Sequence, residues 1–173
     1  MNPSRSASHR VLAILVGCVA LGTVTLPARA LAPGQSLPIS NVSGKDAAAL
    51  PLVDGKARVT YIDFWASWCG PCRQSFPWMN RMQDKFGAKG LRIVAVNLDA
   101  KRADAQDFLA QLPARFELGF DSGGAAARQF GVKTMPSSVL VGPDGKVIAV
   151  HNGFREEDEA ELEQRIAAAL ARP

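Results

Sequence analysis

Two long apolar runs predict the centre of a β-sheet. Residues 58–66 (RVTYIDFWA) and 91–98 (LRIVAVNL) are almost continuous in β-branched, aromatic and aliphatic residues, a composition typical of strands that are buried on both faces. Two shorter runs, 138–141 and 146–151, flank a Gly-Pro-Asp-Gly tetrapeptide at 142–145. Because this tetrapeptide has turn chemistry, the two shorter runs predict an antiparallel hairpin.

Helical periodicity separates these strands. Apolar side chains recur every three or four positions from about 71 to 86, and a proline at position 71 suits the first turn of a helix. Shorter helices are predicted over 105–112 and 125–130, and a last one over 156–172, where acids cluster at the start and a base lies near the end. The predicted order is β-α-β-α-α-β-β-α. The fold class is therefore α/β, with a mixed central sheet flanked by helices.

The beginning of the chain has the pattern of an export signal. Residues 1–10 contain arginine and no acid, residues 11–26 are apolar, and Ala28-Arg29-Ala30 resembles a signal-peptidase site. This pattern predicts a cleaved signal peptide over residues 1–30. Two alternatives stay open: the apolar run could remain as a membrane anchor, and Leu-Val-Gly-Cys ending at Cys18 could be a lipoprotein processing site.

One domain is expected over residues 31–173. Its first part, residues 31–56, is rich in Gly, Pro and Ser and predicts an extended N-terminal segment or a hairpin. The whole chain has 20 basic and 16 acidic residues, and removal of the three arginines before residue 31 leaves 17 basic against 16 acidic. There is no basic block with interleaved aromatic residues, so nucleic-acid binding is not expected.

The exported domain has two cysteines, Cys69 and Cys72, separated by Gly70 and Pro71. A structural zinc site needs about four ligands, which this pair does not supply. A purely structural disulfide is also disfavoured, because closing such a short loop removes little entropy from the unfolded chain. The position instead favours reactivity. Cys69 should lie just before a helix, where free N–H groups stabilise a thiolate, and Cys72 should be shielded one turn later.

The segment YIDFWASWCGPC, residues 61–72, resembles the active-site strand and loop of thioredoxin, and residues 131–136 (GVKTMP) resemble its cis-proline loop. The export signal, the segment before the first strand and the insertion between Leu98 and Asp121 resemble the TlpA-like (TlpA/ResA-type) branch of the thioredoxin superfamily. The resemblance covers about 36–170. It implies a thioredoxin-like fold with an N-terminal extension, and an exported thiol-disulfide oxidoreductase.

The strand pattern and the resemblance to the thioredoxin superfamily together indicate individual site residues. Asp63 is a charged residue in an apolar strand; it could face water at the rim, or lie buried behind Cys72 and shuttle its proton. A cis Met135–Pro136 bond is implied, which would expose backbone groups beside Cys69 to an extended substrate. The residues that remain as candidates for substrate contact are Trp68, Gly70 and Pro71.

Two positions depart from the TlpA-like pattern. Many members have Asn where this chain has Asp63, and the branch often has Glu where this chain has Ser75. Both positions bear on the choice of partner.

The expected reaction is disulfide exchange with protein substrates, in which Cys69 attacks and Cys72 resolves. The chain would act as a reductant fed by a membrane thiol electron donor, with a possible N-terminal membrane tether. It would lie in the periplasm or at the outside face of the cytoplasmic membrane, in a branch with relatives in cytochrome c maturation. No metal or cofactor is expected beyond the redox-active pair.

Two other classes of function stay open. One is a copper-binding module that uses both thiolates and His151, and the other is a thiol peroxidase.

Overall fold

The computed structural model describes residues 31–172, so the predicted signal or anchor over residues 1–30 lies outside the described residues. The strands in this range are β1 (Asn41–Ser43), β2 (Ala49–Pro51), β3 (Val59–Trp65), β4 (Leu91–Asn97), β5 (Glu117–Phe120), β6 (Ser137–Val141) and β7 (Val147–Asn152). The helices are α1 (Gly70–Phe86), α2 (Arg102–Gln111), α3 (Ala125–Gln129) and α4 (Glu159–Leu170), with short 3₁₀ turns η1 (Gly87–Lys89) and η2 (Glu156–Asp158). Within residues 31–172, none of the helices combines the length and the apolar character needed to cross a bilayer.

The seven strands form one mixed sheet in the order β2-β1-β5-β4-β3-β6-β7. Strand β4 pairs in parallel with β3 and with β5, whereas the other neighbouring strands are antiparallel. All seven residues of β3 and all seven of β4 are buried. This confirms the prediction that the two long apolar runs form the centre of the sheet, because only central strands are covered on both faces.

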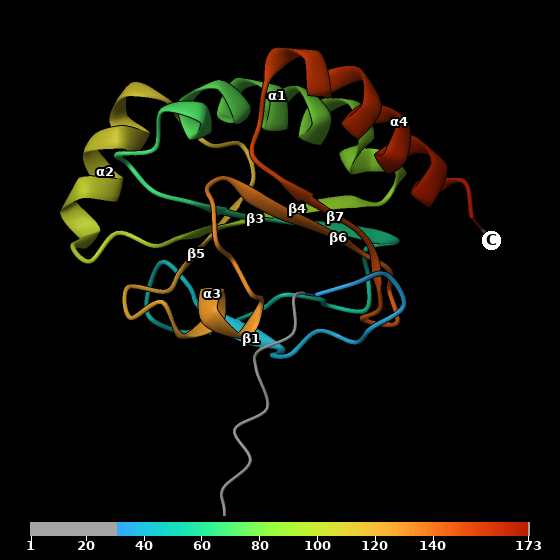
Figure 1. The fold of residues 1–173 in the computed structure, drawn as a ribbon, viewed down its shortest axis with the longest axis horizontal. Helices are drawn as coiled ribbons and strands as arrows, with labels where there is room; N and C mark the ends of the chain where they lie inside the picture. Colours follow the sequence, from blue (N-terminus) through green and yellow to red (C-terminus); the bar gives the residue numbers. More distant parts are fainter. Residues whose placement is uncertain (1–30, 173) are drawn as a thin grey trace, which may run out of the picture.

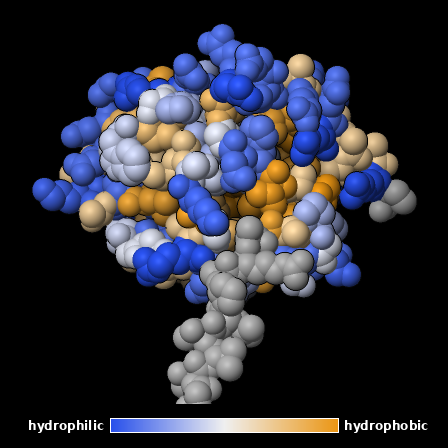
Figure 2. Space-filling model, viewed as in Figure 1, coloured by the Kyte–Doolittle hydropathy of each residue, from blue (hydrophilic) through white to orange (hydrophobic). Residues whose placement is uncertain are grey.

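Helices cover both faces of the sheet, which confirms the predicted layering. Figure 1 shows α1, α2 and α4 on one side, and α3 with the N-terminal segment on the other. The first layer buries a cluster that includes Phe76, Phe108 and Ile166, and the second buries one that includes Ile62 and Phe130. In the space-filling view, hydrophilic side chains gather over the helices at the top, and hydrophobic ones show at the level of the sheet (Figure 2).

The sequence prediction missed strand β5. Its four residues, Glu-Leu-Gly-Phe, are too few for a clear alternation, and a glycine within a strand weakens the pattern. The strand forms because β4 and β1 pair with its two edges. Gly119 is required there, since a Cβ at this position would lie 2.6 Å from Cγ2 of Val42. The observed order is therefore β-α-β-α-β-α-β-β-α after the N-terminal hairpin of β1 and β2.

Arg92 ties the N-terminal hairpin to the centre of the sheet. Its side chain is nearly buried, and it donates two hydrogen bonds of 2.7 Å to the Glu117 carboxylate. The same guanidinium donates to the carbonyl oxygens of Pro51, at 2.9 Å, and Leu52, at 3.3 Å. Bidentate pairs of this kind combine charge with fixed geometry, so Arg92 holds β5 and the end of the hairpin in one arrangement.

We expect Arg92→Met to lower the free energy of unfolding by about 1–3 kcal/mol, because it leaves one carboxylate and two carbonyl groups without their donor. Arg81→Met is the matched control, since it removes an exposed pair with Glu159 and should cost less than about 1 kcal/mol. Urea unfolding of both variants measures the difference. Equal losses in the two variants would show that Arg92 has no special structural role.

Candidate active site

Cys69 and Cys72 lie at the start of α1, directly after the central strand β3. Cys69 is the N-cap of the helix, with φ −84° and ψ 108°, and its sulfur accepts a hydrogen bond of 3.2 Å from the backbone N–H of Cys72. The two sulfurs form a disulfide with a Cα–Cα distance of 5.3 Å. The first turn of α1 has no acidic residue. When the pair is reduced, the free N–H groups and the helix dipole therefore favour a thiolate at Cys69.

The surroundings of the pair are asymmetric. Cys72 is fully buried, whereas Cys69 keeps 4% of its surface exposed. In the disulfide form, therefore, only an edge of the Cys69 side chain reaches solvent. The large exposed group is Trp68, at 71%, beside it, and Gly70 and Pro71 are also exposed.

Asp99, which the sequence analysis missed, anchors the loop that leads to Cys69. Its carboxylate accepts hydrogen bonds from the Ser67 backbone N–H, at 3.0 and 3.2 Å, and from the Ser67 hydroxyl, at 3.0 Å. The side-chain amide of Asn97 donates a further bond of 2.7 Å. The signal was the Asn-x-Asp pattern at the end of β4, because parallel strands β3 and β4 end at the same edge.

Asp63 is buried within β3, which excludes the alternative of a rim position facing water. Its exposed fraction is 1%, and burial raises the pKa of its carboxyl well above the ordinary value. On the same face of β3, Tyr61 and Trp65 belong to the buried cluster that also contains Cys72. The Oδ2 atom of Asp63 has no hydrogen-bond partner within residues 31–172. The group is therefore suited to hold a proton, since its ionised form is poorly solvated.

The Met135–Pro136 peptide bond is cis and comes directly before β6. Pro136 is buried, and its carbonyl accepts a hydrogen bond of 2.7 Å from the Gly153 backbone N–H. Met135 is half-buried and packs against the cluster that contains both cysteines. The structure thus brings Met135 of the GVKTMP loop to the same cluster as the disulfide, whereas Val132 of that loop packs against the cluster on the other face.

Two further residues of the sequence analysis have defined positions. Ser75 is buried one turn after Cys72, and its hydroxyl donates to the Cys72 carbonyl at 3.1 Å. His151 lies on the outer strand β7, with its Nε2 atom 3.6 Å from Oδ2 of Asp158. Over the described part of the chain, there is no cluster of three or more His, Cys, Asp or Glu side chains that could hold a metal ion.

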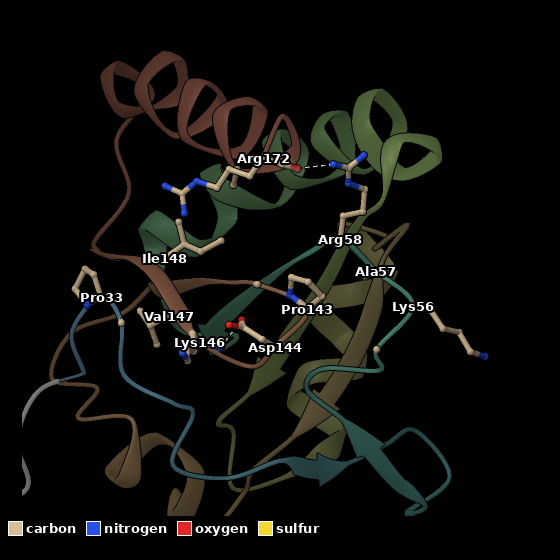
Figure 3. Close-up of a pocket in the computed structure, with 14 residues that line it drawn as sticks. Pro33, Lys56, Ala57, Arg58, Pro143, Asp144, Lys146, Val147, Ile148 and Arg172 are labelled. Atoms are coloured by element: carbon tan, nitrogen blue, oxygen red, sulfur yellow. Dashed lines mark hydrogen bonds between the residues drawn. The ribbon is translucent and has the colours of Figure 1, made fainter.

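A large pocket of about 840 Å³ lies at the other end of β3 (Figure 3). Its charged lining residues are Lys56, Arg58, Asp144, Lys146 and Arg172. One of them, Arg58, donates a hydrogen bond of 2.6 Å to the Arg172 carbonyl. Arg58 precedes the first residue of β3, whereas Cys69 follows the last, so the strand of about 20 Å separates this pocket from the disulfide.

Known proteins with a similar sequence share the chemistry that this arrangement allows. The Redoxin family model matches residues 32–166. Thiol-disulfide oxidoreductase ResA of Bacillus cereus (strain ATCC 10987 / NRS 248) is 30% identical over 128 residues, which cover 74% of each chain. ResA of Bacillus thuringiensis subsp. konkukian is 29% identical over 157 residues, or 88% of this chain and 91% of the relative.

Solved structures agree with these relatives. A crystal structure from Chlorobium tepidum, of a protein described as a thiol:disulfide interchange protein DsbE, has 54% sequence identity and a TM-score of 0.78. The match covers 82% of this chain and 100% of that one. StoA of Bacillus subtilis, with 21% identity and a TM-score of 0.63, shares the fold. The chain belongs to the Redoxin family, and it is a thiol-disulfide oxidoreductase of the TlpA/ResA type within the thioredoxin superfamily.

Proposed function

We propose that this oxidoreductase is a reductant that acts on disulfides of protein substrates outside the cytoplasm. The observation that carries the exchange chemistry is the placement of Cys69 at the N-cap of α1, with Cys72 fully buried one turn later. The proposed direction rests on the Gly70-Pro71 dipeptide instead. A helix N-terminus stabilises the attacking thiolate, and the shielded second sulfur is held within reach of the first.

The exchange proceeds in two steps. The Cys69 thiolate attacks one sulfur of the substrate disulfide, so that a Cys69–substrate disulfide forms and the other substrate sulfur leaves as a thiolate. Cys72 then attacks the Cys69 sulfur and releases the second substrate thiolate, while the Cys69–Cys72 disulfide forms. Two electrons pass from the pair to the substrate, and the reaction needs no further cofactor.

Asp63 is the proposed proton acceptor for the second step. Cys72 must lose its thiol proton to attack, and no water reaches a fully buried sulfur freely. The raised pKa of Asp63 brings the proton affinity of its carboxyl closer to that of a thiol, which makes this transfer less unfavourable. The carboxyl lies on the face of β3 that packs against the cluster containing Cys72.

The proposed substrate surface surrounds the exposed edge of Cys69. Trp68 offers a large apolar ring, exposed at 71%, beside the sulfur. Gly70 and Pro71 add a small exposed surface at the start of the helix, and Met135, which precedes Pro136, packs against the buried cluster that contains both cysteines. An exposed aromatic next to a reactive group is typical of protein contact sites, where rings bury much area at low entropic cost.

The proposal also includes the direction of the reaction and its location in the cell. The dipeptide Gly70-Pro71 matches that of thioredoxin and favours a reducing pair. In the periplasm, or at the outer face of the cytoplasmic membrane, such a pair requires re-reduction by a membrane thiol donor, and the N-terminus would tether the domain near it. Substrates on the path of cytochrome c or oxidase maturation fit this setting, because their haem- or metal-binding cysteines must be reduced.

Cys72→Ser should trap the mixed disulfide, because the variant attacks substrate but has no second thiol to release it. Cys69→Ser should trap none, since the buried Cys72 does not reach substrate. Non-reducing gels and mass spectrometry after incubation with a disulfide-bonded protein measure the trapped species. Trapping by Cys69→Ser instead would reverse the assignment of the two sulfurs.

The reduction potential of the pair should lie closer to thioredoxin, at about −270 mV, than to the oxidant DsbA, at about −120 mV. Equilibration with glutathione or dithiothreitol buffers, followed by quantitative thiol labelling, gives the value. A potential near that of DsbA would make the protein an oxidant and would overturn the proposed direction.

Asp63→Asn should stabilise the protein increasingly as pH rises. Burial raises the folded pKa of Asp63 above its unfolded value, so the folded wild type binds more protons than the unfolded chain between these two pKa values. The free energy of unfolding of the wild type therefore falls as pH rises from about 4 to the folded pKa of Asp63. The variant has no ionisable group at this position, so its free energy of unfolding does not fall for this reason. Urea unfolding across pH measures it.

The same variant should exchange disulfides more slowly near neutral pH, because an amide cannot take the proton of Cys72. Stopped-flow reduction of a substrate disulfide at several pH values tests this. Identical rates for both proteins at every pH would leave Asp63 without a chemical role.

A further inference from the structure

A row of three polar side chains crosses the sheet from Asp63 to its outer strand. In the observed register, Asp63 of β3 lies opposite Ser138 of β6, and Ser138 lies opposite His151 of β7. Residues directly opposite each other in antiparallel pairs project from the same face, with Cβ atoms about 4.5–5.5 Å apart. The three side chains therefore form one polar row on the face covered by α1 and α4, and the neighbouring row of Tyr61 and Leu140 is buried in the core.

The row leads from the interior to the surface. Asp63 is 1% exposed and Ser138 is 4% exposed, whereas the His151 side chain is 23% exposed. Both ends of the row have spare hydrogen-bonding capacity, since Oδ2 of Asp63 and Nε2 of His151 have no hydrogen-bond partner within residues 31–172. Such unpaired buried atoms are uncommon in folded proteins and need an explanation.

A small hollow continues the row beneath α4. It is lined by the polar residues Tyr61, Ser138, His151 and Arg165 and by apolar residues of β6, β7 and α4. Its volume is about 10 Å³, which is close to the space needed for one water molecule. A water there has the hydroxyl and imidazole partners that it requires, so the hollow can join Ser138 to His151.

Charged groups of both signs surround His151. Asp158 of η2 lies 3.6 Å from Nε2 and also 3.5 Å from the Arg155 guanidinium, while Arg165 of α4 lines the hollow. Tyr61 stays neutral, because burial raises the pKa of its phenol. Arg165 is paired with Glu161 of the same helix, and Asp63 lies at the inner end of the row.

We propose that Ser138 and His151 form a proton path between Asp63 and the solvent. The inference rests on the proposed role of Asp63 as the acceptor of the Cys72 proton. After that transfer the O–H bond of the Asp63 carboxyl breaks, its proton passes to the Ser138 hydroxyl, and Ser138 gives up its own proton through the hollow to Nε2 of His151. The imidazolium then releases one proton to bulk water, and reorientation of the Ser138 hydroxyl with exchange of the imidazole tautomer returns each group to its starting state.

The reaction requires that the proton on Asp63 be released while substrate is bound. A substrate on Cys69 and Trp68 covers the one edge where the disulfide reaches solvent, so a proton on Asp63 cannot leave on that side. The row ends at His151 on β7, the edge strand of the sheet, where the histidine side chain is 23% exposed.

The first test is the exchange rate of Ser138→Ala and His151→Gln, measured by stopped flow from mildly acidic to mildly alkaline pH. We expect a loss of about 3- to 10-fold near neutral pH, smaller than the full effect of a general base. In an Asp63→Asn background neither substitution should cause a further loss, because the path then has no proton to carry. Ser137→Ala is the matched control: Ser137 is equally buried on the same strand, but its hydroxyl donates to Asn152 and to the Thr134 carbonyl on the opposite face.

The second test needs no thiol chemistry. In the oxidised wild type, the infrared band of the protonated Asp63 carboxyl should grow after photolytic release of caged protons. The rate of this growth should fall about 10-fold in Ser138→Ala and His151→Gln. Ser137→Ala should keep the wild-type rate. If Asp63 is protonated at the wild-type rate in both path variants, the inference is overturned, whether or not the protein reduces disulfides. If protonation is slower in the variants but the wild type does not reduce disulfides, the proton path stands and the proposed function is wrong.

Discussion

The parallel pairing of β3 with β4 is the constraint on which the site depends. It ends both strands at the same edge, with Trp65 opposite Asn97, so the loop that leaves β3 lies against the residues that follow β4. Asp99 can then bind the backbone and the hydroxyl of Ser67, and this fixes the turn in which the Cys69 N–H bonds the Ala66 carbonyl at 3.1 Å. The helix begins where that turn ends. Its N-terminus is thereby presented to the sulfur on one side and to solvent on the other.

The central strands and the longer helices were predictable because their signals are local. Residues 59–65 and 91–97 are buried on both faces, so they show as unbroken apolar runs, and α1 and α4 each carry an apolar stripe of helical period. Strand β5 has no such signal, because its exposed Glu117 and its Gly119 resemble a loop. It is a strand because β4 and β1 supply partners, and the glycine is there because Val42 leaves no room for a side chain. Neither fact is encoded within the segment itself.

The residues of the site also divide into those with a local sequence signal and those that only the tertiary structure identifies. Cys69 and Cys72 are visible in the sequence because their chemistry lies within one helical turn, and Asp63 is visible because a charge within an apolar strand needs a reason. Asp99 and Ser138 are ordinary residues until the strand order and register place them beside Ser67 and Asp63. The slight exposure of Cys69 also depends on tertiary structure, since the loop turns its sulfur inward over the core and leaves Trp68 outside.

The burial of Asp63 connects stability with reactivity through one physical cause. An ordinary carboxyl has a pKa near 4 and a free thiol one near 8.5, so moving a proton from Cys72 to an exposed carboxylate would be uphill by about 6 kcal/mol. Burial destabilises the ionised carboxylate and narrows this gap, and the same destabilisation lowers the stability of the fold at neutral pH. The aromatic packing of Trp65 against Phe76 and Phe108, with ring centroids 4.7 and 4.8 Å apart, offsets that loss beside the site. A carboxyl that binds protons tightly in a dry core must still exchange them with water, and the polar row across β6 and β7 supplies that connection without opening the core around the cysteines.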